Sequence, residues 1–370
     1  MAPGLDGMAV QDPAAGQAAK VEIPDSEARP VMQLQVVLDR LGFTPGVIDG
    51  KQGASTRNAL VGFQEANGLA TTGEFDAPTK QALARWNNIQ ATRVVTIPAE
   101  FAQGPFHAMP AKPEEQAKMP ALGYISLDEK LAERFHTTVA ALQALNPGGM
   151  PAGAPGTATR EAAASESASP TVAPSNPVSS ASFAPQPGPA PLFHASQQVR
   201  VPNTGSAPVT SESSHDAQWG VTLLQLGVGS EQPKVDKIVV SKSKGTLRAY
   251  DKSGKLVGIY TATMGSSHDP LPLGSWKVNG VARNPPFHYN PKLFWDSSST
   301  ATRQTLPPGP NGPVGVVWID LNKDHYGIHG TPQPQTIGRA ESHGCVRLTN
   351  WDAARLAQMV SPGTQVRFEP

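Results

Sequence analysis

The sequence predicts a multidomain protein in which two small helical units and a disordered linker precede a mostly β domain. Three observations support this architecture. Apolar residues recur at helical spacing in residues 31–90 and again in 91–150. Residues 151–196 are rich in alanine, proline and serine, so they bury too little apolar surface to offset the entropy of ordering them. From residue 234 to residue 370, apolar and polar residues alternate between turn signals, which is typical of strands.

The composition bears on partners and location. The chain holds 30 basic and 30 acidic residues, so its formal net charge is zero. This balance argues against nucleic acid or an anionic membrane surface as a partner. No stretch approaches the roughly 18 apolar residues that a membrane span needs. The N-terminus lacks the basic and apolar regions of a signal peptide, which leaves open a cytosolic protein or an exported one whose signal has been removed.

The first unit is expected to contain three helices. Residues 1–30 show no apolar periodicity and are predicted to be a disordered arm, and residues 31–90 follow as a compact unit. The second helix should begin at an N-cap of Ser55 or Thr56, and the third at Asp76.

This unit carries caps, turn residues and core residues in a distinctive order. They are Leu34, Gln35, Gly42, Phe43, Pro45, Gly46, Ile48, Asp49, Gly50, Gly53, Thr56, Phe63, Gln64, Gly68, Leu69, Thr72, Gly73 and Asp76. Taken by themselves, these residues specify only helix ends, turns and a core. Their order resembles the peptidoglycan-binding domain of type 1, and this resemblance implies binding to the cell wall.

The second unit, residues 91–150, predicts two short helices. Leu127, Leu131 and Phe135 line the first of them. The pair is similar to the helical part of a LysM-like module, which normally ends with a strand. The strand-like residues 197–205 would complete the module from beyond the linker. Residues 204–233 stay ambiguous, although the stretch "WGVTLLQLGV" within them suits a short helix that packs on a neighbour.

The last domain, residues 234–370, is long enough to form one core. Its strands are interrupted by one clear helix, "TNWDAARLAQMVSPG", which should be N-capped by Thr349 or Asn350 and end at Pro362. The following residues, "TQVRFEP", are predicted to form a final strand.

Cys345 is the only cysteine of the chain, which excludes an internal disulfide and a cysteine-only zinc site. A lone cysteine is either a small buried apolar residue or a reactive thiol. Its neighbours favour the second interpretation. His343 and His329 offer imidazoles that can accept the thiol proton, and Gly344 permits a tight turn whose amide groups can face an oxyanion.

A metal site is the rival interpretation of these residues. His325 and His329 are four residues apart, and His343 with Cys345 would complete a set of four ligands. That spacing suits a helix, but "HYGIHG" contains two glycines and follows a strand-like run. The sequence therefore predicts no metal and no other cofactor.

The stretch "HGTPQPQTIGRAESHGCVRL", residues 329–348, closely resembles the signature of the L,D-transpeptidase catalytic domain of the YkuD type. The resemblance extends over residues 234–370. It implies that Cys345 is the nucleophile and that His329 is the general base, oriented by the main-chain carbonyl of Gly330.

The same resemblance implies that His343 and Gly344 shape the site and its oxyanion hole. Arg347 stands where many relatives carry asparagine, and we assign it to substrate binding together with Tyr289 and Ser342.

The implied function is that of a periplasmic or cell-envelope enzyme of cell wall biogenesis. It would form a thioester with a peptidoglycan tetrapeptide stem, release D-Ala, and pass the acyl group to an amine. The amine is that of a neighbouring stem, which gives a 3-3 cross-link, or a lysine of an envelope protein. Alternatives are an L,D-carboxypeptidase or cysteine hydrolase, in which water is the acceptor, and a non-catalytic wall-binding protein. The linker composition predicts that wall binding and chemistry reside in separable halves of the chain.

Overall fold

The N-terminal part of the chain is helical, as its apolar spacing predicts. The computed structural model describes residues 23–155, 184–205, 216–294, 297 and 300–370. Three helices come first, α1 (Pro30–Arg40), α2 (Ala54–Ala66) and α3 (Ala77–Leu83), and a 3-10 turn at Ala84–Trp86 extends the last. Their apolar faces share a core that includes Leu38, Leu60 and Phe63.

The start of α3 agrees with the prediction from the sequence, and the start of α2 does not. Asp76 caps α3 by accepting a hydrogen bond from a backbone N–H of the first turn, as expected. The expected N-cap of α2 at Ser55 or Thr56 is wrong, because α2 begins after Gly53 without a side-chain cap. Thr56 lies inside the first turn, where its hydroxyl accepts a hydrogen bond from the Gln35 amide at 3.1 Å. This buried contact ties α1 to the start of α2.

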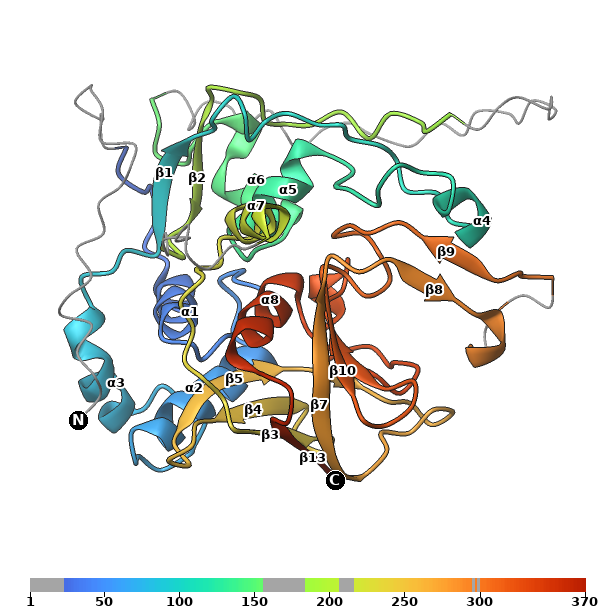
Figure 1. The fold of residues 1–370 in the computed structure, drawn as a ribbon. Coiled ribbons are helices and arrows are strands. Elements are labelled where there is room, and N and C mark those ends of the chain that lie inside the picture. The colour runs from blue at the N-terminus through green and yellow to red at the C-terminus, as the bar shows by residue number, and fades with distance from the viewer. Residues whose placement is uncertain (1–22, 156–183, 206–215, 295–296, 298–299) are drawn as a thin grey trace.

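The next part contains a strand that the sequence analysis does not predict. Strand β1 (Thr92–Thr96) pairs antiparallel with β2 (Gln198–Pro202), which is the strand expected within 197–205. Between them lie α4 (Pro113–Gln116), α5 (Leu127–Arg134), α6 (Val139–Leu145) and a 3-10 turn at Pro147–Gly149. The chain thus runs strand, helices, strand, and α5 and α6 pack against the strand pair (Figure 1).

The arm expected to be disordered to residue 30 is anchored over its last residues, and residues 1–22 of it lie outside the described part. The buried guanidinium of Arg200 donates hydrogen bonds of 2.9 Å to the carbonyl oxygens of Ile23 and Pro24. These two carbonyls accept hydrogen bonds from the buried guanidinium, which would otherwise lack these partners. This end of the arm is therefore ordered, contrary to the prediction of a disordered arm.

The predicted linker, residues 151–196, is also held at its ends, while residues 156–183 lie outside the described part. Phe193 is buried, and the N–H groups of Leu192 and Phe193 donate to the carboxylate of Asp128. One large apolar side chain and one buried carboxylate are enough to order this stretch, which its composition does not reveal.

The C-terminal domain is mostly β, as predicted, and is built on one nine-stranded sheet. Its strands are β3 (Lys237–Ser241), β4 (Thr246–Tyr250), β5 (Leu256–Thr261), β6 (Thr263–Met264), β7 (Gly274–Arg283), β10 (Val317–Leu321), β11 (Gly327–His329), β12 (Val346–Arg347) and β13 (Gln365–Glu369). The spatial order is β5-β4-β3-β13-β7-β10-β11-β12-β6. The two edge strands, β5 and β6, are consecutive in the chain, so the sheet must curl until its edges meet.

The predicted helix and final strand of this domain are confirmed. Helix α8 (Asn350–Met359) is N-capped by Thr349, and β13 enters the middle of the sheet between β3 and β7. The ambiguous stretch before the domain forms α7 (Ala217–Leu226), which is capped by Asp216 and ends at Gly227 in the left-handed conformation. Both helices contribute to the main core.

The two halves of the chain are not separate, contrary to the expectation from the linker. Figure 1 shows α2 lying along β5 and the helices α5 and α7 grouped above α8. The apolar core of the N-terminal helices includes Leu256 and Ile259 of β5, which pack with Phe43. A fragment of residues 234–370 would expose these side chains to water.

A buried ion pair crosses the same interface. Arg355 of α8 donates to both carboxylate oxygens of Asp39 of α1, at 2.8 and 2.9 Å. The ring of His136, from the turn between α5 and α6, stacks on Trp351 of α8 at 5.2 Å. All three parts of the protein therefore meet at α8.

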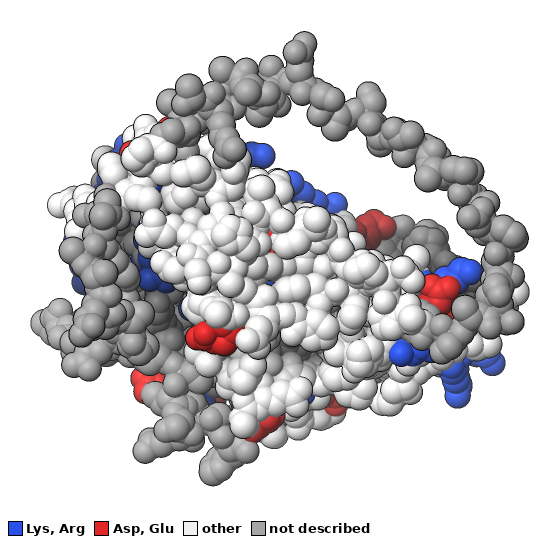
Figure 2. Space-filling model, turned by 90° about the horizontal axis from the view of Figure 1, so that it is seen from above, with Lys and Arg blue, Asp and Glu red and all other residues white. Residues whose placement is uncertain are grey.

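The surface carries few charges, as the composition indicates. Figure 2 shows one face on which uncharged side chains predominate and acidic and basic residues are scattered. Among the residues that the structure describes, no helix has the length and apolarity to cross a membrane.

Candidate active site

Cys345 is sixteen positions from His329 in the chain, yet it directly precedes a strand that pairs with the strand of His329. Strands β11 and β12 pair in parallel, with Ile328 opposite Val346 and His329 opposite Arg347. Cys345 directly precedes β12, so it lies beside Gly327 at the start of β11, two residues before His329. The connection between these two strands includes a 3-10 turn at Pro334–Thr336.

His329 is buried and held in one orientation. Its Nδ1 lies 2.7 Å from the carbonyl oxygen of Gly330, which can only accept, so Nδ1 carries the proton and Nε2 is free to act as a base. The ring also stacks on Trp318 with centroids 5.6 Å apart. Burial, followed by the positive charge of Arg347, lowers the pKa of His329 to about 3. The imidazole is therefore neutral at physiological pH.

Cys345 is a neutral thiol in the resting site. Burial raises the pKa of the Cys345 thiol, and the backbone N–H of Gly327 and the charge of Arg347 offset only part of that effect. Its Sγ donates to the carbonyl oxygen of His325 at 3.6 Å. A neutral thiol beside a neutral imidazole favours proton transfer during attack over a preformed thiolate–imidazolium pair.

The turn before Cys345 is fixed by Ser342. The hydroxyl of Ser342 donates to the Cys345 carbonyl oxygen at 2.7 Å and accepts from the N–H of Gly265 at 2.6 Å. Ser342 is itself buried, so the structure gives its hydroxyl a role in holding the turn. The substrate contact that we assign to Ser342 stays a prediction.

Gly344 is required by the geometry of this turn. Its φ is +96°, and a Cβ at this position would lie 2.8 Å from the ring of Tyr326. A side chain here would meet both backbone strain and an aromatic ring. The site therefore needs glycine one residue before the thiol.

Aromatic rings connect His343 and Tyr289, two other predicted site residues. Phe294 packs edge-on against His343 with centroids 5.0 Å apart and stacks on Tyr289 at 5.4 Å. Tyr289 belongs to β8 (Phe287–Tyr289), which pairs with β9 (Gln304–Leu306) in a hairpin, and a 3-10 turn at Pro291–Leu293 follows β8. The hairpin thereby reaches the turn that precedes Cys345.

Arg347 lies half-buried on β12, two residues after the thiol. Its positive charge lowers the pKa of both His329 and Cys345. This electrostatic influence is compatible with the substrate contact that we assign to Arg347, and that contact stays a prediction.

The rival metal interpretation receives no support from the geometry. Within the described residues, no group of three histidine, cysteine, aspartate or glutamate side chains is arranged to hold a metal ion. His325 adopts a left-handed backbone conformation, and its carbonyl, not its ring, contacts the thiol.

Asn350, the first residue of α8, supports the site and is absent from the predicted set. Its Oδ1 accepts from the N–H of Val316 and lies where a Cβ on Gly330 would have to be. Its amide Nδ2 donates to Glu133 of α5 at 2.7 Å and to a backbone carbonyl of the catalytic domain. The sequence shows Asn350 only as a helix start, so nothing in its pattern points to the site.

Glu133 links this support to the second unit. Burial raises the pKa of Glu133 to about 7, although hydrogen bonds from Tyr124 and Asn350 partly compensate. Helix α5 thus reaches the site through two contacts. Glu133 of α5 accepts a hydrogen bond from Asn350, and Asn350 packs against Gly330, whose carbonyl orients His329.

Comparisons with known proteins identify two parts of the chain. The family model for the L,D-transpeptidase catalytic domain, YkuD, matches residues 236–368. A second model, "Putative peptidoglycan binding domain", matches residues 27–83. The fold and the matches define the class of protein, a multidomain protein with a peptidoglycan-binding domain and an L,D-transpeptidase catalytic domain.

Individual relatives carry the assignment further. "Putative L,D-transpeptidase YkuD" of Bacillus licheniformis is 32% identical over 151 residues, which are 41% of this chain and 76% of that protein. "Probable L,D-transpeptidase YbiS" of Escherichia coli is 30% identical over 135 residues, 35% of this chain and 44% of that protein. The chain belongs to the YkuD family of L,D-transpeptidases.

Solved structures give a weaker likeness. L,D-transpeptidase 3 from Mycobacterium tuberculosis, in complex with a faropenem-derived adduct, aligns with a TM-score of 0.31 and 21% identity. The alignment covers 39% of this chain and 62% of that chain, which is less than two thirds of the solved protein.

The two neutral groups predict an unusual pH dependence. Alkylation of Cys345 by iodoacetamide should be slow at pH 7 and should accelerate only above pH 9, because the thiol pKa is raised. The rate of acylation of Cys345, with His329 as base, should stay constant from pH 5 to pH 8. The pKa of the imidazole is lowered to about 3, so the ring stays neutral over this range. Both rates can be followed by intact-mass measurement. A fall in acylation near pH 6.5 would show that the histidine has an ordinary pKa.

Proposed function

We propose that this protein is a peptidoglycan L,D-transpeptidase that uses Cys345 as nucleophile and His329 as general base. The observation that carries the proposal is the parallel pairing of β11 with β12, which supports it because Cys345 directly precedes one strand and the buried His329 belongs to the other. The hydrogen bond from Nδ1 of His329 to Gly330 leaves Nε2 as the acceptor for the thiol proton.

The first half-reaction forms a thioester. Sγ of Cys345 attacks the carbonyl carbon at the L-centre of diaminopimelate in a tetrapeptide stem, and its proton passes to Nε2 of His329. Amide N–H groups of the turn at Gly344 and Cys345 would stabilise the oxyanion. The tetrahedral intermediate then expels D-Ala, whose nitrogen takes the proton back from the imidazolium.

The second half-reaction restores the thiol. An amine attacks the thioester carbonyl, His329 accepts the amine proton, and the thiolate leaves and is reprotonated. An amine of a second stem gives a 3-3 cross-link, and a lysine of an envelope protein gives an anchored protein. We assign His343, Tyr289, Ser342 and Arg347 to shaping the site and binding the stem.

The N-terminal parts would hold the enzyme on its substrate. The residues matched by the peptidoglycan binding model support wall binding by α1 to α3. The order β1, α5, α6, β2 supports a LysM-like module, completed by β2 from beyond the linker segment. We place the protein in the periplasm or cell envelope, where this substrate is found.

The products identify the reaction. Purified protein should be incubated with disaccharide-tetrapeptides and the muropeptides analysed by mass spectrometry. We expect dimers joined through two diaminopimelate residues, together with released D-Ala. Trimmed tripeptides without dimers would indicate an L,D-carboxypeptidase, and cleavage elsewhere in the stem a cysteine hydrolase. Unchanged tetrapeptides from a folded protein would indicate a wall-binding protein without catalysis.

A further inference from the structure

A groove lined by both polar and apolar residues lies where the three parts of the protein meet. Two adjoining cavities, with volumes of about 120 and 600 Å³, share six lining residues. These are Asp49, Lys51, Thr138, Pro334, Gln335 and Arg339. The first two come from the loop before α2, Thr138 from the start of α6, and the last three from the connection between β11 and β12.

The groove borders the candidate active site without containing it. Neither Cys345 nor His329 is among the lining residues of either cavity. Its catalytic wall, however, is the segment that begins after Gly330 and ends at Ser342, and both ends of that segment belong to the site. A ligand in the groove would therefore lie against the chain that joins the base to the nucleophile.

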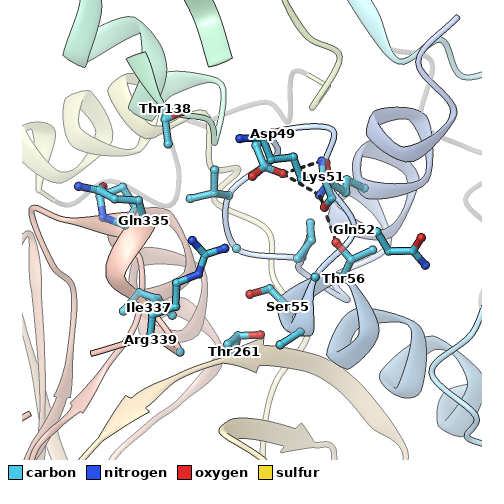
Figure 3. A pocket seen from close by; sticks show the side chains of 18 residues that line it. Asp49, Lys51, Gln52, Ser55, Thr56, Thr138, Thr261, Gln335, Ile337 and Arg339 are labelled. Atoms are coloured by element: carbon cyan, nitrogen blue, oxygen red, sulfur yellow. Dashed lines mark hydrogen bonds between the residues drawn. The ribbon is translucent and has the colours of Figure 1, made fainter. Parts of the chain in front are cut away.

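Two cations face this space. Figure 3 shows the side chain of Arg339 reaching into the pocket, opposite the loop that carries Asp49 and Lys51. Arg339 and Lys51 are exposed, and neither side chain pairs with a carboxylate among the described residues. The nearby carboxylate of Asp49 already accepts hydrogen bonds from the Gln35 amide and the Lys51 backbone N–H. The larger cavity is also lined by Glu129 and Glu133, whose carboxylates accept hydrogen bonds from Ile125, Asn311 and Asn350. Within the described part of the chain, the groove thus offers two unpaired cations beside three carboxylates that already have hydrogen-bond partners.

The chemistry of the lining indicates the class of ligand. Guanidinium and ammonium groups bind carboxylates by charge-assisted hydrogen bonds, and arginine does so in a bidentate manner. The larger cavity contains one aromatic residue, Tyr124, and that residue is buried. The lining therefore suits an anionic peptide better than the flat faces of sugar rings.

We infer that this groove binds a carboxylate-bearing segment of a peptidoglycan stem peptide and aligns it beside the catalytic domain. The inference rests on the proposed function, because it names stem peptides as the substrate. It goes beyond that function by assigning the binding to residues of three parts of the chain. Arg339 and Lys51 would hold carboxylates from opposite walls, while Thr138 and Gln335 would offer hydrogen bonds to the peptide backbone.

The test is a binding titration on the full chain carrying Cys345→Ala, so that no turnover occurs. Isothermal titration calorimetry with a disaccharide-tetrapeptide should show roughly tenfold weaker binding after Arg339→Gln or Lys51→Gln, since each removes one charge-assisted contact. Lys252→Gln is the matched control, because Lys252 is exposed, lies in the turn between β4 and β5 and does not line the groove. Its affinity should equal that of the parent.

Three results would overturn the inference. The first is unchanged affinity in both groove variants when their thermal unfolding matches the parent. The second is an equal loss in Lys252→Gln, which would show a nonspecific charge effect. The third is binding of chitotetraose, a sugar without a peptide, that the groove variants also weaken, which would make this a glycan site. Acylation of unsubstituted protein by a carbapenem tests the proposed function separately, so a failure there is distinguishable from a failure here.

Discussion

Replacing Cys345 with alanine is expected to abolish stem-peptide turnover, with a loss of roughly five to six orders of magnitude in rate. The substitution removes the atom that forms the thioester, and no other cysteine is available in the chain. Incubation with a carbapenem followed by intact-mass measurement should show one adduct on the parent protein and none on Cys345→Ala. An adduct that persists in the variant would place the nucleophile elsewhere.

The fold should survive this change, which makes the result interpretable. Cys345 is only half-buried, and its Sγ contacts the carbonyl of His325 at 3.6 Å and the backbone of Gly327. We expect the thermal midpoint of Cys345→Ala to match the parent closely. As a comparison, His329→Ala should slow acylation by roughly 10²–10⁴-fold, the usual contribution of a general base. Turnover at the parental rate in either variant would contradict the catalytic assignment.

Asp39→Ala is expected to destabilise the whole protein by about 3–5 kcal/mol, because it leaves Arg355 buried with only its longer contact to Asp352, at 3.7 Å. The bidentate contact between these two residues joins α1 to α8 and is largely shielded from water. Burial acts to raise the pKa of Asp39, but the charge of Arg355 and the contacts from His136 outweigh it and hold that pKa well below its usual range. Denaturant unfolding of both proteins measures the difference.

A matched pair controls for simple charge removal. Arg57 and Glu74 also form an ion pair, but both side chains are mostly exposed. Glu74→Ala should therefore cost less than about 1 kcal/mol. Replacing Asp39 by leucine and Arg355 by methionine together should recover part of the loss, since a buried pair can be exchanged for apolar side chains. An Asp39→Ala cost no larger than that of Glu74→Ala would show that the modules do not depend on this contact.

The pH dependence has a defined sign. The folded-state pKa of Asp39 is depressed, so its contribution to stability is present above the unfolded-state value of about 4 and is lost as the pH falls further. The gap in unfolding free energy between parent and Asp39→Ala should accordingly shrink below pH 4. A gap that stays constant from pH 7 to pH 3 would mean that Asp39 has an ordinary pKa.

The sequence by itself determined the local elements and singled out the candidate residues of the site. Alternation and helical spacing predicted the mostly β domain, α8 with its Thr349 cap, and the final strand β13. Cys345, His329 and Gly344 stood out because a lone thiol, an imidazole and a turn glycine have a joint chemical meaning. These signals are local, since propensity, capping and residue type act within a few positions of the chain.

Only the tertiary structure decided which surfaces meet. Periodicity shows that a face is buried but not what covers it, so the packing of α2 on β5 could not be predicted. The pairing of Asp39 with Arg355 joins residues 316 positions apart, and neither residue carries a local sign of its partner. Linker composition predicted independent halves, yet the apolar and ionic contacts of these faces make them one body. Two features depend on this packing of the parts against one another. They are the contact of Asn350 with Gly330 and the groove lined by Arg339 and Lys51.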